Sequence, residues 1–151
     1  MARINEVVTV WQEYLAGAPN WEKLVAGVEP KAGGCGLVYE LSNPIDRPNE
    51  SLAIADMRNL ELSDPHKHIN GETEVYFVLQ GKGKIVVGHE VSQLAPGVII
   101  VTPPDTLHIT LPGKDLVLAV VNMPPFELNN YVAVPRSDPT VARALDLLRA
   151  H

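Results

Sequence analysis

The chain of 151 residues has the length of one ordinary domain, with 46% hydrophobic residues, 20% charged residues and a formal net charge of −6 at pH 7. This composition excludes a disordered chain, and it argues against nucleic acid as a partner because no basic stripe is present to neutralise phosphates. The single cysteine cannot form an internal disulfide, and no apolar run approaches the length of a membrane span. The first residues also lack a signal-peptide profile, so we expect a cytoplasmic protein with no membrane partner.

Residues 1–36 are interpreted as an N-terminal arm that precedes the main domain. Apolar residues recur in it at helical spacing: Ile4, Val7, Val8, Trp11 and Leu15. The run from Val7 to Val10 would also suit a strand, so both interpretations stay open at this point. We expect the arm to cover one face of the domain or a neighbouring subunit.

Residues 37–126 carry a β signal, which is consistent from residue 51 to residue 121. The short apolar runs 52–62, 74–79, 84–87, 98–101 and 116–122 are separated by turns rich in Gly, Pro and Asp. Short strands with a turn about every 8–12 residues favour a sandwich or a barrel. We therefore place an all-β domain at residues 37–126.

Residues 127–151 form a tail that ends in a predicted helix. Ser137 or Asp138 can cap this helix, and Pro139 would occupy its first turn, where proline is favoured. One face of the helix is apolar: Val141, Ala144, Leu145 and Leu148. We expect the helix to pack on the outside of the domain or on a partner subunit.

The stretch from His66 to Gly81 carries the residues of greatest chemical interest. His66 and His68 are two residues apart, so on a strand both imidazoles point to the same face. Glu74 and Tyr76 share one face of the next strand, and His108 lies downstream in a proline-bounded turn. Imidazoles together with a carboxylate suit Fe, Mn, Co, Ni or Zn better than Ca or Mg.

This arrangement resembles the cupin family over roughly residues 50–125. The first cupin motif (His-x-His, a few residues, Glu, six residues, Gly) is matched by His66, His68, Glu74 and Gly81. The second motif is matched from Gly97 through Pro103 to His108. The resemblance implies an all-β jelly-roll barrel, or double-stranded β-helix. It also implies one divalent transition metal (Fe, Mn, Ni or Zn), whose ligands would be His66, His68, Glu74 and His108.

Three departures from the family pattern affect this interpretation. The gap between His68 and Glu74 is about two residues longer than usual, which leaves Glu72 as a rival ligand on the same strand face. We favour Glu74 because the residues that follow it match the strand-and-turn half of the motif. Asp105 replaces the motif glycine, but aspartate tolerates a positive φ better than most residues. Pro112 replaces an asparagine that is not a ligand in the family.

The resemblance implies metal chemistry without fixing the reaction, because cupins include dioxygenases, decarboxylases and sugar-phosphate isomerases. We favour a dioxygenase-like enzyme that acts on a small oxygenated organic molecule. The alternatives are a metal-dependent isomerase or decarboxylase, and a non-catalytic small-molecule or sugar-binding cupin. Tyr76, as a hydrogen-bond donor, and Glu72, as an acid or base beside the metal, are the candidate catalytic residues. We also expect a homodimer, because a partner subunit could cover the apolar arm and the C-terminal helix.

Overall fold

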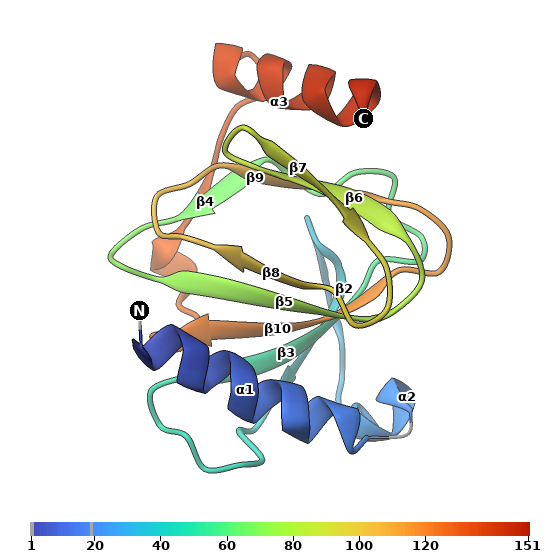
Figure 1. Cartoon of the computed structure of the whole chain (residues 1–151), viewed down its shortest axis with the longest axis vertical. Coiled ribbons are helices and arrows are strands. Elements are labelled where there is room, and N and C mark those ends of the chain that lie inside the picture. Colours follow the sequence, from blue (N-terminus) through green and yellow to red (C-terminus); the bar gives the residue numbers. More distant parts are fainter. Residues whose placement is uncertain (1, 19) are drawn as a thin grey trace.

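A computed structural model of the chain describes residues 2–18 and 20–151. This part of the chain forms two antiparallel β-sheets that face each other, with one long helix outside each sheet (Figure 1). The N-terminal helix α1 (Ala2–Ala16) lies across one sheet and is followed by the single turn α2 (Trp21–Leu24). The C-terminal helix α3 (Pro139–Ala150) lies over the other sheet.

The first sheet has six strands in the spatial order β1-β2-β3-β10-β5-β8. In that order the strands are β1 (Lys31–Gly33), β2 (Gly36–Leu41), β3 (Ser51–Asp56), β10 (Val117–Met123), β5 (Thr73–Gln80) and β8 (Ile99–Thr102). The second sheet has five strands in the order β11-β4-β9-β6-β7. These are β11 (Tyr131–Ala133), β4 (His66–His68), β9 (His108–Pro112), β6 (Gly83–Val87) and β7 (Glu90–Leu94), and the short helix η1 (Leu128–Asn130) precedes β11.

The central strands of the six-stranded sheet are buried on both faces. Val75 and Phe77 of β5 belong to the apolar cluster that contains Trp11 of α1, on the outer face of the sheet. Tyr76 and Val78 alternate with them and belong to the cluster between the sheets. A strand that is covered on both faces reads as a continuous apolar run, and β10 shows the same pattern. The helix α1 therefore completes the core on the side away from the second sheet.

Both terminal helices pack on their own chain. The helical interpretation of the N-terminal segment is confirmed, and the apolar face of α1 is buried, with Trp11 fully inaccessible. Asp138, and not Ser137, caps α3, because its side chain accepts a hydrogen bond of 2.8 Å from the Thr140 amide. Val141 of α3 packs on the outer face of β6 and β9. The homodimer stays a prediction.

The jelly-roll architecture expected from the sequence is confirmed, but the sheets do not close into a barrel. Within residues 2–18 and 20–151, no strand pairing joins one sheet to the other, so β1, β8, β11 and β7 are edge strands. Strands β1 and β11 lie outside residues 37–126 but pair with β2 and β4, and the division into arm, domain and tail stays a prediction. In the same part of the chain, no helix has both the length and the apolar character that crossing a bilayer requires.

Candidate metal centre

The two facing sheets bring the four predicted ligands together. His66 of β4 lies opposite His108 of β9 in the antiparallel register, and His68 follows two residues later on the same face. Glu74 comes from β5 of the other sheet. One ligand atom from each of the four residues lies within 4.8 Å of those of the other three, and all four side chains are buried. The cluster contains Glu74 and does not contain Glu72.

A tight turn accommodates the long gap between the second histidine and the glutamate. Asn70 and Gly71 both have positive φ, 58° and 76°, and the Glu72 amide donates to the Ile69 carbonyl at 3.3 Å. Two consecutive left-handed residues closed in this way form a type I′ turn, for which Asn-Gly is the preferred sequence. Asp105 has a φ of 60°, so aspartate adopts the conformation that the motif glycine would otherwise provide.

Backbone carbonyls fix the rings of two histidines. The Nδ1 atom of His66 lies 2.7 Å from the carbonyl oxygen of Asp64, and that of His108 lies 3.1 Å from the carbonyl oxygen of Thr106. A carbonyl can only accept, so Nδ1 carries the proton in both rings. A ring that carries its only proton on Nδ1 has its lone pair on Nε2, the atom that would face a metal, and Nε2 of His108 lies 3.2 Å from Oε1 of Glu74.

The environment of His68 differs from that of His66 and His108, and it indicates whether the site suits a metal. Both of its ring nitrogens are buried and neither makes a hydrogen bond of regular geometry. Nevertheless, Nδ1 lies 2.5 Å from Oε2 of Glu72, and Nε2 lies 3.2 Å from Oε2 of Glu74. A buried polar atom without a regular partner requires an explanation, and ligation of a cation at Nε2 supplies one. Three imidazoles and one carboxylate form a donor set that suits Fe, Mn, Ni or Zn.

The surroundings within the site favour a neutral imidazole at His66 and an ionised carboxylate at Glu74. Burial, together with the neighbouring His108, lowers the pKa of His66 to about 3, so this ring is neutral at pH 7. Burial also acts to lower the pKa of His68, but the carboxylates of Glu72 and Glu74 outweigh it and raise the value to about 9. Burial acts to raise the pKa of Glu74, but His108 and His68 outweigh it and hold the pKa well below its usual value.

A cavity of about 590 Å³ opens onto this cluster. Its walls are mostly apolar side chains from the six-stranded sheet and the loops beside it, including Leu41, Leu52, Ala55, Met57, Val120 and Phe126. His66, His68 and Glu74 form part of the same wall. The volume is within the range of about 300–1,000 Å³ that is typical of small-molecule sites. An organic molecule in this cavity would therefore contact the ligand cluster directly.

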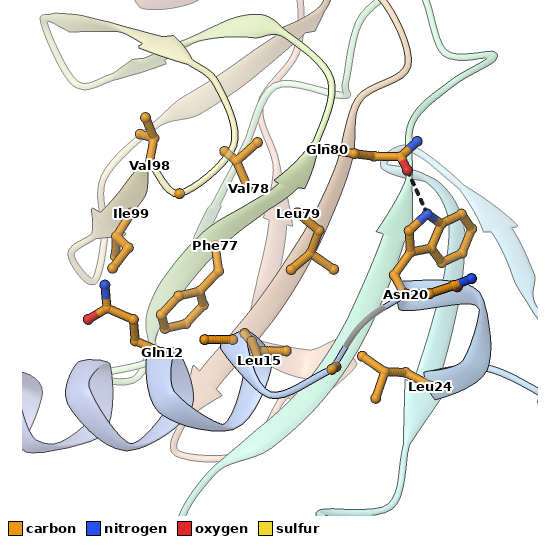
Figure 2. A pocket seen from close by; sticks show the side chains of 14 residues that line it. Gln12, Leu15, Asn20, Leu24, Phe77, Val78, Leu79, Gln80, Val98 and Ile99 are labelled. Atoms are coloured by element: carbon orange, nitrogen blue, oxygen red, sulfur yellow. Dashed lines mark hydrogen bonds between the residues drawn. The ribbon is translucent and has the colours of Figure 1, made fainter.

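A second hollow of about 400 Å³ lies on the outer face of the six-stranded sheet, between the N-terminal helices and β5 (Figure 2). Phe77 and Leu15 face this space, and the indole of Trp21 donates a hydrogen bond of 3.0 Å to Gln80. Its lining contains no histidine, cysteine or carboxylate. The chemistry of the molecule is therefore concentrated in the cavity between the sheets.

The two predicted catalytic residues occupy different surroundings. Tyr76 lines the cavity, and the centroid of its ring lies 6.1 Å from that of His108. Burial, and secondarily the Glu74 carboxylate, raises the pKa of Tyr76 well above its usual value, so its hydroxyl keeps its proton and can donate it in a hydrogen bond. Glu72 is fully buried and is absent from the cavity wall. Its carboxylate lies against Nδ1 of His68.

Sequence reasoning missed two residues of the site. The side-chain amide of Asn122 donates to Oε2 of Glu74 at 3.0 Å and to Oε2 of Glu72 at 3.2 Å. Asn122 is the one polar residue in the run 117–123, and this isolated polarity could have indicated a role. Tyr131 stacks on His66 with a centroid distance of 4.6 Å and an interplanar angle of 21°. No local pattern marks Tyr131, because β11 reaches β4 only through the tertiary fold.

Comparison with known proteins agrees with this geometry. Residues 59–120 match the sequence model of the cupin domain family. A gentisate 1,2-dioxygenase from Haloferax sp. is 36% identical over 74 residues, which cover 48% of this chain and 20% of that protein. The chain thus spans about a fifth of the length of this relative.

Solved structures share the fold at low sequence identity. A nucleoside dehydratase from Streptomyces superimposes with a TM-score of 0.61 at 14% identity, covering 73% of this chain and 87% of that one. Oxalate decarboxylase from Bacillus subtilis gives a TM-score of 0.60 at 13% identity, covering 73% of this chain and 31% of that one. At these identities the likeness establishes the architecture alone.

Proposed function

We propose that this chain, which carries a cupin domain, is a metal-dependent, dioxygenase-like enzyme that acts on a small oxygenated organic molecule. The observation that carries the proposal is the buried cluster of three histidines and one glutamate on the wall of an apolar cavity. His66, His68, Glu74 and His108 would hold one divalent transition metal. When bound, such a metal supplies Lewis-acid chemistry or, if it is redox-active, chemistry with dioxygen.

The side chains of the cavity support catalysis on a small molecule. The mostly apolar walls lower the polarity around the reacting groups, which strengthens the electrostatic interactions made there. The protonated hydroxyl of Tyr76 is available to donate a hydrogen bond to an oxygen of the substrate. Asn122 holds the Glu74 carboxylate in place through its 3.0 Å hydrogen bond.

The partial sequence match to a gentisate 1,2-dioxygenase favours dioxygen chemistry over isomerisation or decarboxylation. Gentisate combines a carboxylate and phenolic oxygens on one ring, and it is therefore the first substrate to test. The matched 74 residues are only a fifth of that relative, so this assignment of reaction and substrate is part of the proposal.

Oxygen uptake by the iron-loaded protein tests the proposal. Protein reconstituted anaerobically with Fe(II) is mixed with gentisate, and then with other small hydroxylated acids, in an oxygen electrode. We expect substrate-dependent oxygen consumption that Tyr76→Phe slows without loss of metal. Tyr39→Phe is the matched control, because Tyr39 packs in the cluster that contains Trp11, away from the metal cavity.

Two results would contradict the proposal. If the metal-loaded protein binds these compounds in calorimetry and consumes no oxygen with any of them, it is a binding protein. If carbon dioxide is released from an acid without oxygen uptake, it is a decarboxylase.

A further inference from the structure

Glu72 is a buried carboxylate with an unusual set of contacts. It is fully inaccessible and lies in the turn between β4 and β5. Its Oε2 atom lies 2.5 Å from Nδ1 of His68 and accepts from the Asn122 amide at 3.2 Å. Its Oε1 atom accepts from the Glu127 backbone amide at 3.3 Å and from the Asn130 side chain at 3.4 Å. Both carboxylate oxygens are therefore occupied inside the protein.

The hydrogen bonds that Glu72 accepts do not by themselves require a charged side chain. Burial of a carboxylate is unfavourable unless a positive charge compensates for it. Among the described residues, no lysine or arginine forms an ion pair with Glu72, and His68 is the group that faces it. The group placed to compensate for a charge on Glu72 is therefore the imidazole of His68, together with a cation bound to that ring.

His68 differs from the other two histidines of the cluster in how its ring is held. His66 and His108 place Nδ1 against backbone carbonyls, whereas His68 places Nδ1 against a side-chain carboxylate. A carboxylate at one imidazole nitrogen fixes the ring and raises the basicity of the other nitrogen. In His68 that other nitrogen is Nε2, which faces Glu74.

We infer that Glu72 is a positioning residue, and neither a metal ligand nor an acid–base catalyst. It holds Nδ1 of His68 so that Nε2 faces the metal, and its charge strengthens metal binding. This inference rests on the proposed metal site. Imidazoles ligate in the neutral form, so the carboxylates of Glu72 and Glu74 are the groups that would balance the charge of a divalent cation in a low-dielectric interior.

Metal affinity of Glu72→Gln tests the inference. Glutamine preserves the shape of the side chain and removes the charge. Dissociation constants for Zn(II) and Co(II) are measured at pH 7 by competition with a chromophoric chelator. We expect a weakening of about 10- to 100-fold, the usual effect of removing such a carboxylate. At saturating metal, the variant should bind one equivalent with an unchanged Co(II) visible spectrum.

Glu50→Gln provides a matched control. Glu50 is also a buried carboxylate that accepts hydrogen bonds from side chains, and it lies under α1, away from the metal cavity. We expect this variant to lose stability and to keep the metal affinity of the wild type within about twofold. The pair separates a loss of charge at the site from a general loss of stability.

Two results would overturn the inference. An unchanged affinity in folded Glu72→Gln would show that Glu72 is purely structural. A changed Co(II) spectrum at saturating metal, as expected for Glu74→Gln, would show that Glu72 is a ligand. Failure of the wild type to bind metal would instead refute the proposed function.

If Glu72→Gln does not fold, ¹⁵N-histidine NMR of the wild type tests the inference. We expect a downfield proton on Nδ1 of His68, and an Nδ1 atom without a proton contradicts the inference.

Discussion

Replacing Glu50 by glutamine should weaken the attachment of the N-terminal helix to the sheet. The buried Glu50 carboxylate accepts hydrogen bonds from the indole of Trp11 at 2.7 Å and from the guanidinium of Arg47 at 2.8 Å. Hydrogen bonds to a charged group contribute about 1.5–3 kcal/mol each, and those to a neutral group about 0.5–1.5 kcal/mol. Both donors reach the same oxygen, Oε2, so glutamine can accept both bonds but lacks the charge that strengthens them. We therefore expect the free energy of unfolding to fall by about 2–3 kcal/mol. For a chain of this size the melting temperature should fall by about 4–12 °C.

The effect should depend on pH in a direction that the structure fixes. Burial acts to raise the pKa of Glu50, but the hydrogen bonds from Arg47 and Trp11 outweigh it and hold the pKa below the usual value of 4.5. The stabilisation is therefore complete above pH 4.5 and is lost as the pH falls through the lowered pKa of the folded state. Glutamine does not titrate, so the difference between wild type and variant should shrink in acid.

Urea denaturation of the metal-free proteins, followed by circular dichroism at several pH values between about 7 and 3, measures this difference. Equal unfolding free energies at pH 7, or a difference that grows on acidification, would refute the reasoning.

Three further predictions follow from the packing and the cavity. Trp11→Ala removes a fully buried indole and should cost about 3–5 kcal/mol in urea denaturation; a loss below about 1 kcal/mol would mean that α1 does not pack as described. Gly81→Ala should lower the melting temperature, because Gly81 has a φ of 83° and an added Cβ would lie 2.3 Å from the Asp115 backbone. An unchanged melting temperature would exclude this close approach. Tyr76→Phe should keep one bound metal and show slower substrate-dependent oxygen uptake; if metal content falls in parallel with uptake, Tyr76 acts on the metal site.

The resemblance to the two cupin motifs, added to local spacing, predicted the set of candidate ligands. His66 and His68 share a face because the period of a strand is two residues, and the second motif identified His108. The choice of Glu74 over Glu72 also agrees with the cluster. Strand parity alone could not separate Glu72 from Glu74. The chain passes from one sheet to the other between His68 and Glu74, through the turn at Asn70 and Gly71, so the parity of β4 does not carry over to β5.

Other features could not be predicted because they depend on contacts between distant segments. The run from Val7 to Val10 suits a helix or a strand until the outer face of the six-stranded sheet is available for α1 to cover. Closure of the sheets depends on pairing between edge strands, and no residue pattern encodes that pairing. The contacts of Glu72 with His68 and Asn130 likewise join segments that only the fold brings together.

Metal stoichiometry tests the central claim most directly. Wild type, His66→Ala, Glu74→Ala and His108→Ala are dialysed against Zn(II) or Fe(II), and bound metal is measured by elemental analysis beside circular dichroism as a check of folding. We predict one equivalent in the wild type and a strong loss in each folded variant. A well-folded wild type that takes up no metal would contradict the claim.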